Sequence, residues 1–209
     1  MNNLNQLGTE RKLRSEKGKH PFKNPRWVYE GEKLRVHIAA LGDVGATTLM
    51  GLKLLGSDVI ETIGIIDLDE NRMKRYEAEC NQICYPWAYD VLPKVVLLKE
   101  DELFDCDVFI FCATKGVPPV GTAVQDVRMQ QLRANRSIVE SYAKKARTCG
   151  YDGLFAVVSD PVEPLCNAAW QISNCNESGA FDDNGLHLEQ VQGLSLIHIS
   201  EPTRQEAIS

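Results

Sequence analysis

Short apolar runs alternate along the chain with longer stretches that have helical periodicity. Strands without polar alternation are buried on both faces, and their alternation with helices indicates a parallel sheet with helices on each side. The sequence therefore predicts a doubly wound α/β fold. The expected strands are residues 35–41, 62–66, 95–98, 108–113 and 154–158, and the expected helices are residues 46–55, 70–84, 126–149 (with a break near residue 135 left open) and 162–172.

The first expected strand runs into a glycine-rich turn. Ligands of such sheets bind beyond the carboxyl ends of the strands. Ala40-Leu41-Gly42-Asp43-Val44-Gly45 has the frame of the dinucleotide fingerprint GxGxxG, with alanine in place of the first glycine. Gly42 would let the backbone approach a pyrophosphate at the helix N-terminus, and Gly45 would let the helix pack closely on the strand. An ordinary strand–helix turn is the alternative.

An acidic residue ends the second expected strand. Asp67 follows Gly42 by 25 residues, near the place of an acid that accepts hydrogen bonds from ribose hydroxyls. An acid here disfavours a 2′-phosphate, so NAD is preferred over NADP, although the nearby Arg72 leaves NADP open. The alternative role of Asp67 is to cap the following helix.

From residue 34 to residue 172, these segments resemble the amino-terminal half of the lactate/malate dehydrogenase family. The resemblance rests on the glycine turn, on Asp67, and on three further segments that begin at Ala113, Arg128 and Val158. It implies an NAD-binding domain of the Rossmann type. The cofactor contacts that it implies are Gly42, Val44, Gly45, Asp67, Ala113, Thr114, Gly116, Asn135 and Val158.

The same resemblance implies two catalytic residues. Arg128 would polarise a substrate carbonyl while hydride passes between the nicotinamide and a small 2-hydroxy or 2-oxo acid. An exposed arginine on a helix face is the alternative. Asp160 stands where the family has a substrate-binding asparagine. An ionised aspartate donates no hydrogen bond and repels a carboxylate, so either the substrate is not a simple 2-hydroxy acid anion or Asp160 has another task.

Two loop features depart from the family. The loop between Gly121 and Arg128 is four residues longer than usual, and Lys115 replaces a small residue. Residues 118–120 contain no arginine for a second carboxylate, so malate is not favoured as the substrate.

The catalytic histidine of the family, with its aspartate and a carboxylate-binding arginine, belongs to a second domain. None of them is recognisable here: His187 lacks the His-Gly context, and His37 lies within the first expected strand. We expect residues 173–193 to begin a truncated substrate domain. We also expect this fragment to bind NAD weakly without turnover, and the parent protein to be a homo-oligomer.

The last residues look foreign. Leu-Ser-Leu-Ile-His-Ile-Ser-Glu-Pro-Thr-Arg, at positions 194–204, resembles the translation of a transposon-based sequencing adaptor. We therefore expect residues 194–209 to be non-native. A genuine amphipathic carboxyl-terminal segment is the alternative.

Composition and charge narrow the class of protein. With 209 residues, 44% hydrophobic and 25% charged, the chain is neither disordered nor fibrous. It has no apolar run of the roughly 20 residues that a membrane span needs, and its start lacks the apolar segment of a signal peptide, so we expect a cytoplasmic protein without membrane partners. Seven cysteines without paired CxxC spacing are expected to be reduced and mainly structural, with no metal site.

Residues 1–33 form a basic arm. Residues 1–35 hold nine lysines and arginines against four glutamates. The arm contains no nucleic-acid-binding motif, so we expect a surface extension rather than a nucleic-acid partner.

Two other functions stay open. An NAD-dependent glycosidase relative would share the cofactor domain, and metal-dependent glycosidase activity would favour it. A nucleotide-sensing protein without catalysis would fit the altered first glycine and Asp160.

Overall fold

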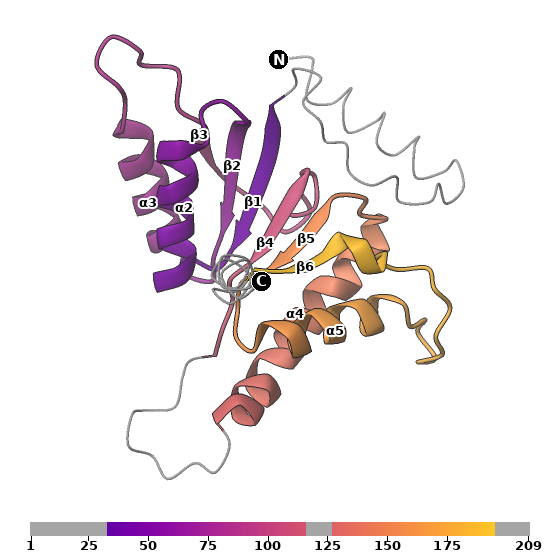
Figure 1. The fold of residues 1–209 in the computed structure, drawn as a ribbon. Coiled ribbons are helices and arrows are strands. Elements are labelled where there is room, and N and C mark those ends of the chain that lie inside the picture. Colours follow the sequence, from indigo (N-terminus) through magenta and orange to yellow (C-terminus); the bar gives the residue numbers. More distant parts are fainter. Residues whose placement is uncertain (1–32, 116–126, 195–209) are drawn as a thin grey trace, which may run out of the picture.

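The computed structural model describes residues 33–115 and 127–194. Within these ranges, six strands form a single parallel sheet in the order β3-β2-β1-β4-β5-β6 (Figure 1). The predicted doubly wound parallel sheet is confirmed. The strands are β1 (Leu34–Ala39), β2 (Ile60–Ile66), β3 (Lys94–Leu97), β4 (Val108–Phe111), β5 (Leu154–Val157) and β6 (Val191–Gly193).

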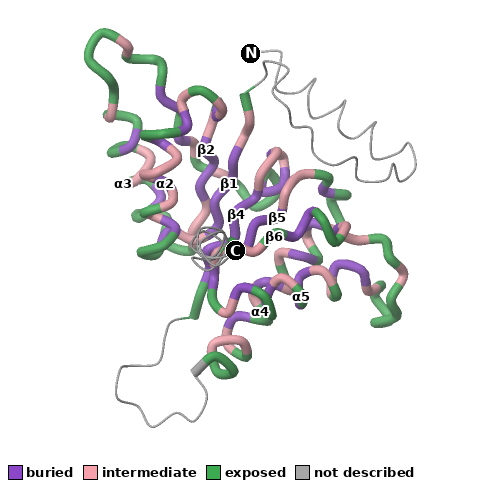
Figure 2. The backbone as a smooth tube through the Cα atoms, in the orientation of Figure 1, coloured by how far each residue is buried: buried purple, intermediate pink, exposed green. Residues whose placement is uncertain are grey.

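Four α-helices cover the two faces of this sheet. Helices α2 (Asp43–Leu55) and α3 (Glu70–Gln82) lie on one face, and α4 (Val127–Cys149) and α5 (Val162–Ser173) lie on the other (Figure 1). Each face has its own apolar core, with the buried strands between the two layers (Figure 2). All four expected helices are present. Helix α4 continues through Asn135 without the break that the sequence left open.

The order of the strands places a crevice at one edge of the sheet. The chain moves outward from β1 to β2 and β3, and then returns to the other side of β1 with β4. The connecting helices therefore leave the carboxyl ends of β1 and β4 toward opposite faces. In open α/β sheets this switch point is where ligands bind.

The segment after α5 extends the same sheet, which the sequence did not predict. Residues 188–190 form a 3₁₀ turn, and β6 then pairs in parallel with β5. Leu186 is fully buried in the core under α4 and α5. A side chain at Gly193 would overlap Val162 of α5, so glycine lets β6 lie against that helix. A separate second domain beginning at residue 173 remains a prediction.

Several predictions fall outside the described residues. These are the basic arm up to residue 32, Gly116 with the loop to residue 126, and the tail from residue 195.

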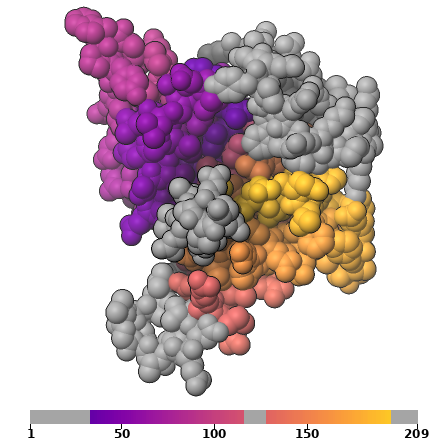
Figure 3. All heavy atoms as spheres, in the orientation of Figure 1, coloured from indigo at the N-terminus to yellow at the C-terminus, as the bar shows by residue number. Residues whose placement is uncertain are grey.

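The surface is uneven on the side of α2 and α3. The chain between α3 and β3 projects beyond the helices, at the upper left of Figure 3. None of the helices in the described ranges is long and apolar enough to cross a membrane.

All seven cysteines are free. Burial raises the pKa of Cys112 to about 12 and that of Cys166 to about 11. Burial also raises the pKa values of Cys80 and Cys149. Because the thiolate is the reactive form, these raised pKa values keep the four thiols protonated and unreactive at neutral pH.

An ion pair joins the end of α4 to the segment after α5. Arg147 donates to the two Asp182 oxygens at 2.8 and 2.6 Å, and to the Ser173 carbonyl oxygen at 2.9 Å. The hydrogen bonds from Arg147 lower the pKa of Asp182 to about 2. This pair fixes the chain segment that connects α5 to β6.

The Arg147–Asp182 pair should make the free energy of unfolding depend on pH in the acidic range. Because the folded-state pKa of Asp182 lies below its ordinary value of 3.8, the stabilisation is complete above pH 4 and is lost as the pH falls to about 2. We expect Asp182→Asn to lower the free energy of unfolding by a constant amount between about pH 5 and 7, and the difference from wild type to shrink below about pH 4. Urea denaturation across this range measures it. Asp183→Asn is the matched control, and a difference that persists at about pH 2 would contradict the role of this pair.

Candidate functional site

The turn between β1 and α2 lies at the centre of the carboxyl edge. The Ala40 amide donates to the Ile66 carbonyl oxygen at 2.8 Å, and the Cys112 amide donates to the Ala39 carbonyl oxygen at 3.0 Å. These bonds tie the end of β1 to both neighbouring strands. The position of the turn is therefore fixed by the sheet itself.

The two glycines of the turn have different surroundings. A Cβ at Gly45 would overlap the carbonyl oxygen of Ala40, so only glycine lets α2 pack this closely on the turn. A Cβ at Gly42 would have no heavy atom within 4 Å. Gly42 precedes α2 as its N-cap residue and supplies no side chain to cap the helix. The amides at the start of α2 thus face an open space, which suits an anion.

Ala40 occupies the place of the missing first glycine. Its φ is +72°, in the left-handed region that favours glycine. The turn keeps the backbone path that the glycine fingerprint requires, although alanine raises its energy. Ala40 therefore adopts the backbone conformation expected of a glycine at this place.

Asp67 connects β2 to this turn. One carboxylate oxygen accepts from the Leu41 amide at 2.6 Å, and the other accepts from the Asp69 amide at 2.9 Å. The Asp67 side chain is 7% exposed, and the Arg72 guanidinium lies 3.6 Å from it. The alternative role of capping α3 is filled by Asp69, whose side chain accepts from the Asn71 and Arg72 amides.

The carboxyl ends of β4 and β5 are held together by side chains. Asn135, which is 1% exposed, accepts from the Lys115 amide at 2.9 Å and donates to the Asp160 carbonyl oxygen at 2.8 Å. It also lies 3.2 Å from the Thr114 hydroxyl. The Ser159 hydroxyl donates to the Ala113 carbonyl oxygen at 2.7 Å. Asn135 is thus a brace between two strand ends, and its contact with a cofactor stays a prediction.

The sequence did not reveal this bracing, although one signal was available. Asn135 interrupts the apolar positions of α4 that include Leu132, Val139 and Ala143. A polar amide within an apolar helix face needs buried partners. Ser159 gave no comparable signal.

The remaining predicted site residues lie at the same edge. Ala113 is the second residue after β4, and Val158 follows β5 directly. Val44 is exposed in the first turn of α2, and Asp160 is exposed beside the brace. Arg128 is exposed in the first turn of α4, seven residues before Asn135. Because seven residues are close to two helical turns, Arg128 and Asn135 share a face of α4, about 10 Å apart along its axis.

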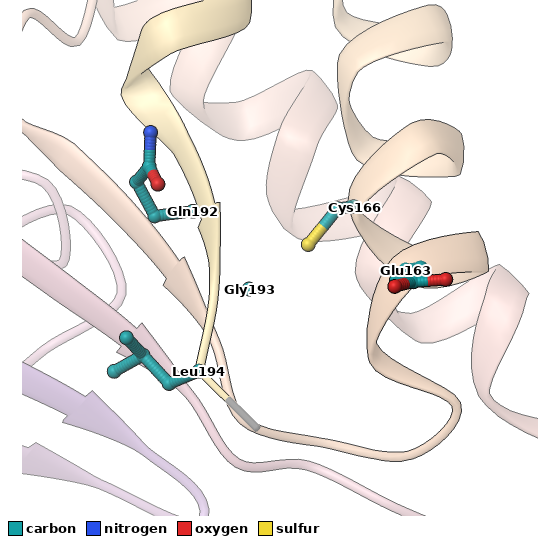
Figure 4. A pocket seen from close by; sticks show the side chains of 5 residues that line it. All are labelled: Glu163, Cys166, Gln192, Gly193 and Leu194. Carbon is teal, nitrogen blue, oxygen red and sulfur yellow. The ribbon is translucent and has the colours of Figure 1, made fainter. Parts of the chain in front are cut away.

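A separate hollow of about 460 Å³ lies near this edge, between α5 and β6. Glu163, Cys166, Gln192, Gly193 and Leu194 line it, and the Cys166 sulfur points toward β6 (Figure 4). Its lining includes neither Gly42 nor Asp67, so it is distinct from the glycine turn. Among the described residues, no group of three His, Cys, Asp or Glu side chains is placed to hold a metal ion.

The two described histidines do not lie at the carboxyl ends of the strands. His37 is 5% exposed within β1, and its Nδ1 lies 2.8 Å from the Leu103 carbonyl oxygen. His187 begins the 3₁₀ turn before β6, where its amide donates to the Gln190 side chain. Neither is placed beside the Gly42 turn or Arg128.

Comparison with known proteins agrees with this arrangement. Residues 34–182 match a family model described as the NAD binding domain of lactate/malate dehydrogenase. The chain belongs to the lactate/malate dehydrogenase family. The matched part is the NAD-binding domain of that family, which confirms the resemblance seen in the sequence and NAD as its cofactor.

Individual members of the lactate/malate dehydrogenase family are distant in sequence. The L-lactate dehydrogenase of Corynebacterium glutamicum (strain R) is 27% identical over 139 residues, covering 66% of this chain and 41% of the relative. That of Bacillus caldotenax is 28% identical over 146 residues, covering 69% and 43%. The chain therefore spans less than half the length of these relatives.

Solved structures of the family share the fold. The minor L-lactate dehydrogenase of Enterococcus mundtii has a TM-score of 0.57 at 22% identity, over 70% of this chain and 44% of that one. The malate dehydrogenase of Picrophilus torridus has a TM-score of 0.58 at 18% identity, over 78% and 46%.

The strain at Ala40 can be measured directly. We expect Ala40→Gly to raise the free energy of unfolding by about 0.5–1 kcal/mol, because glycine adopts a positive φ at little cost. Ala46→Gly, in the right-handed helix α2, should instead lower it by about 1 kcal/mol. Urea denaturation of both variants checks the sign. Equal destabilisation by the two substitutions would exclude strain at Ala40.

Proposed function

We propose that this chain binds NAD across the carboxyl edge of β1, as the cofactor part of an enzyme that transfers hydride between nicotinamide and a small 2-hydroxy or 2-oxo acid. The observation that carries the proposal is the Gly42 turn, with the Asp67 carboxylate bonded to its Leu41 amide. Pyrophosphate and ribose sites thus lie next to each other, at the switch point of a family fold that binds dinucleotides.

The pyrophosphate would lie over Gly42. The space around this residue is open, and the amides and dipole of α2 favour an anion there. Asp43 opposes binding of the pyrophosphate, because this residue places a negative charge in the first turn of the same helix. We therefore expect weak binding.

Asp67 would bind the adenosine ribose. Each of its oxygens accepts one backbone hydrogen bond, and a carboxylate has about four lone-pair sites, so acceptors remain for ribose hydroxyls. Arg72 lies 3.6 Å from Asp67 and 3.9 Å from Asp69, so its positive charge is balanced by two acids. This balance favours NAD over NADP, because a 2′-phosphate would meet net negative charge.

Arg128 would supply the positive charge for the reaction. An arginine directed at a developing oxyanion stabilises it as hydride arrives. Its position on the Asn135 face of α4 supports this role, since Asn135 holds the backbone of Asp160. Asp160 is an exposed carboxylate at this place, so it would repel a negatively charged substrate group and favours a neutral or positive one beside it.

The proposal also covers the cellular compartment and the partners of the parent protein. Seven free cysteines fit the reducing conditions of the cytoplasm. Family membership supports a small-molecule substrate and a homo-oligomeric parent protein, with neither nucleic acid nor membrane as a partner.

Binding at Gly42 can be tested with a pair of glycine substitutions. Neither Gly42 nor Gly51 has a heavy atom within 4 Å of an added Cβ, so both alanine variants should fold. We expect Gly42→Ala to weaken NADH binding by about tenfold or more, because the methyl group keeps the pyrophosphate from the backbone. Gly51→Ala should bind as wild type does. Titration of NADH fluorescence measures this, and unchanged affinity of Gly42→Ala would exclude this site.

Cofactor choice provides a second test. We expect the chain to bind NADH about tenfold more tightly than NADPH, because the Asp67 carboxylate repels a 2′-phosphate. Asp67→Asn should narrow this ratio while keeping an acceptor for the Leu41 amide. Competition titrations give both affinities. If the ratio of NADH affinity to NADPH affinity were the same in wild type and variant, another residue would select the cofactor.

A further inference from the structure

An exposed apolar patch lies at the edge of the sheet opposite the cofactor site. It comes from the end of α2 and from the chain between α3 and β3, which meet at the amino ends of the strands (Figures 1 and 3). We call it the aromatic patch. Its side chains are 40–93% exposed and are Leu54, Leu55, Tyr85, Trp87, Tyr89 and Val91.

The turn that carries the aromatic patch is fixed in place. Tyr85 and Ala88 form an antiparallel bridge, and the Tyr85 hydroxyl donates to the Leu54 carbonyl oxygen at 2.9 Å. Between them, Trp87 has a φ of +68° and is 93% exposed. A bulky residue in the left-handed region is a costly conformation, and here it presents the largest apolar side chain to solvent. Such a feature is typical of a binding anchor.

We propose that residues 20–32 of the same chain dock on the aromatic patch. This end of the basic arm contains Phe22, Trp27, Val28 and Tyr29. Three aromatic side chains within eight residues match the aromatic character of the patch, and aromatic pairs gain contact energy beyond the area that they bury.

The first described residues of the chain lie close to the aromatic patch. The Leu34 amide donates to the Val59 carbonyl oxygen at 2.8 Å, and the Lys33 ammonium group donates to the Ser57 carbonyl oxygen at 2.6 Å. The arm therefore joins the sheet beside the end of α2, three residues from Leu54. Trp27 precedes Lys33 by six residues, which span up to about 20 Å when extended.

The size of the patch favours a tethered segment over a second copy of the chain. A stable interface between proteins uses about 20–30 residues on each side, whereas the patch has six side chains. A tethered segment needs less contact, because its effective concentration is in the millimolar range.

Photocrosslinking in the full chain tests the proposal. A photoreactive phenylalanine analogue replaces Trp87, and in a control it replaces Leu188, which is 63% exposed near β6. We expect the Trp87 position to crosslink to residues 20–32 within a monomer, as mapped by mass spectrometry, and the Leu188 position not to. Crosslinked dimers at Trp87 would instead assign the patch to a second copy. Absence of crosslinks to the arm would also overturn the proposal.

A variant of the arm gives an independent measurement. Phe22→Ser, Trp27→Ser and Tyr29→Ser together should abolish the crosslink and uncover the patch, raising the fluorescence of the dye ANS by about twofold or more. Unchanged circular dichroism and NADH affinity would show that the fold is intact. Unchanged ANS fluorescence and crosslinking would overturn the proposal.

Discussion

The contact between Gly45 and the Ala40 carbonyl oxygen is the constraint on which the site depends. Because position 45 has no side chain, α2 begins directly against the end of β1. Its first amides then lie at the middle of the carboxyl edge, close along the chain to the Leu41 amide, which donates to the Asp67 side chain. A larger residue would push the helix away from the strand and separate the elements that we propose to bind NAD.

The opposite half of the carboxyl edge depends on hydrogen bonds instead of close packing. Asn135 and Ser159 fix the chain after β4 and β5, where it leaves the parallel ladder. Buried amides with several partners hold a unique geometry, since each broken bond leaves a polar group without water. The brace thus orders the backbone beside Asp160, while the exposed side chains stay available for a ligand.

Much of the fold followed from local patterns. Five strands and four helices were expected, because apolar runs and helical periodicity are local properties of the sequence. Strand β6 was missed, since Val191, Gln192 and Gly193 have no strand pattern and are held by tertiary contacts, namely pairing with β5 and packing against α5. The residue that caps α3 could not be identified from the sequence either. Asp67 and Asp69 are both plausible caps, and their distances to backbone amides decide between them.

The sequence alone determined the class of fold, the glycine turn and the family, because these depend on residue types at fixed spacing along the chain. Tertiary structure alone decided which side chains meet across the sheet. It placed Asp67 on the Leu41 amide, gave Ala40 the left-handed backbone of a glycine, and made Asn135 a brace between β4 and β5. The reason is physical: residues far apart along the chain interact through the register of the strands and the packing of the helices, which local patterns do not encode.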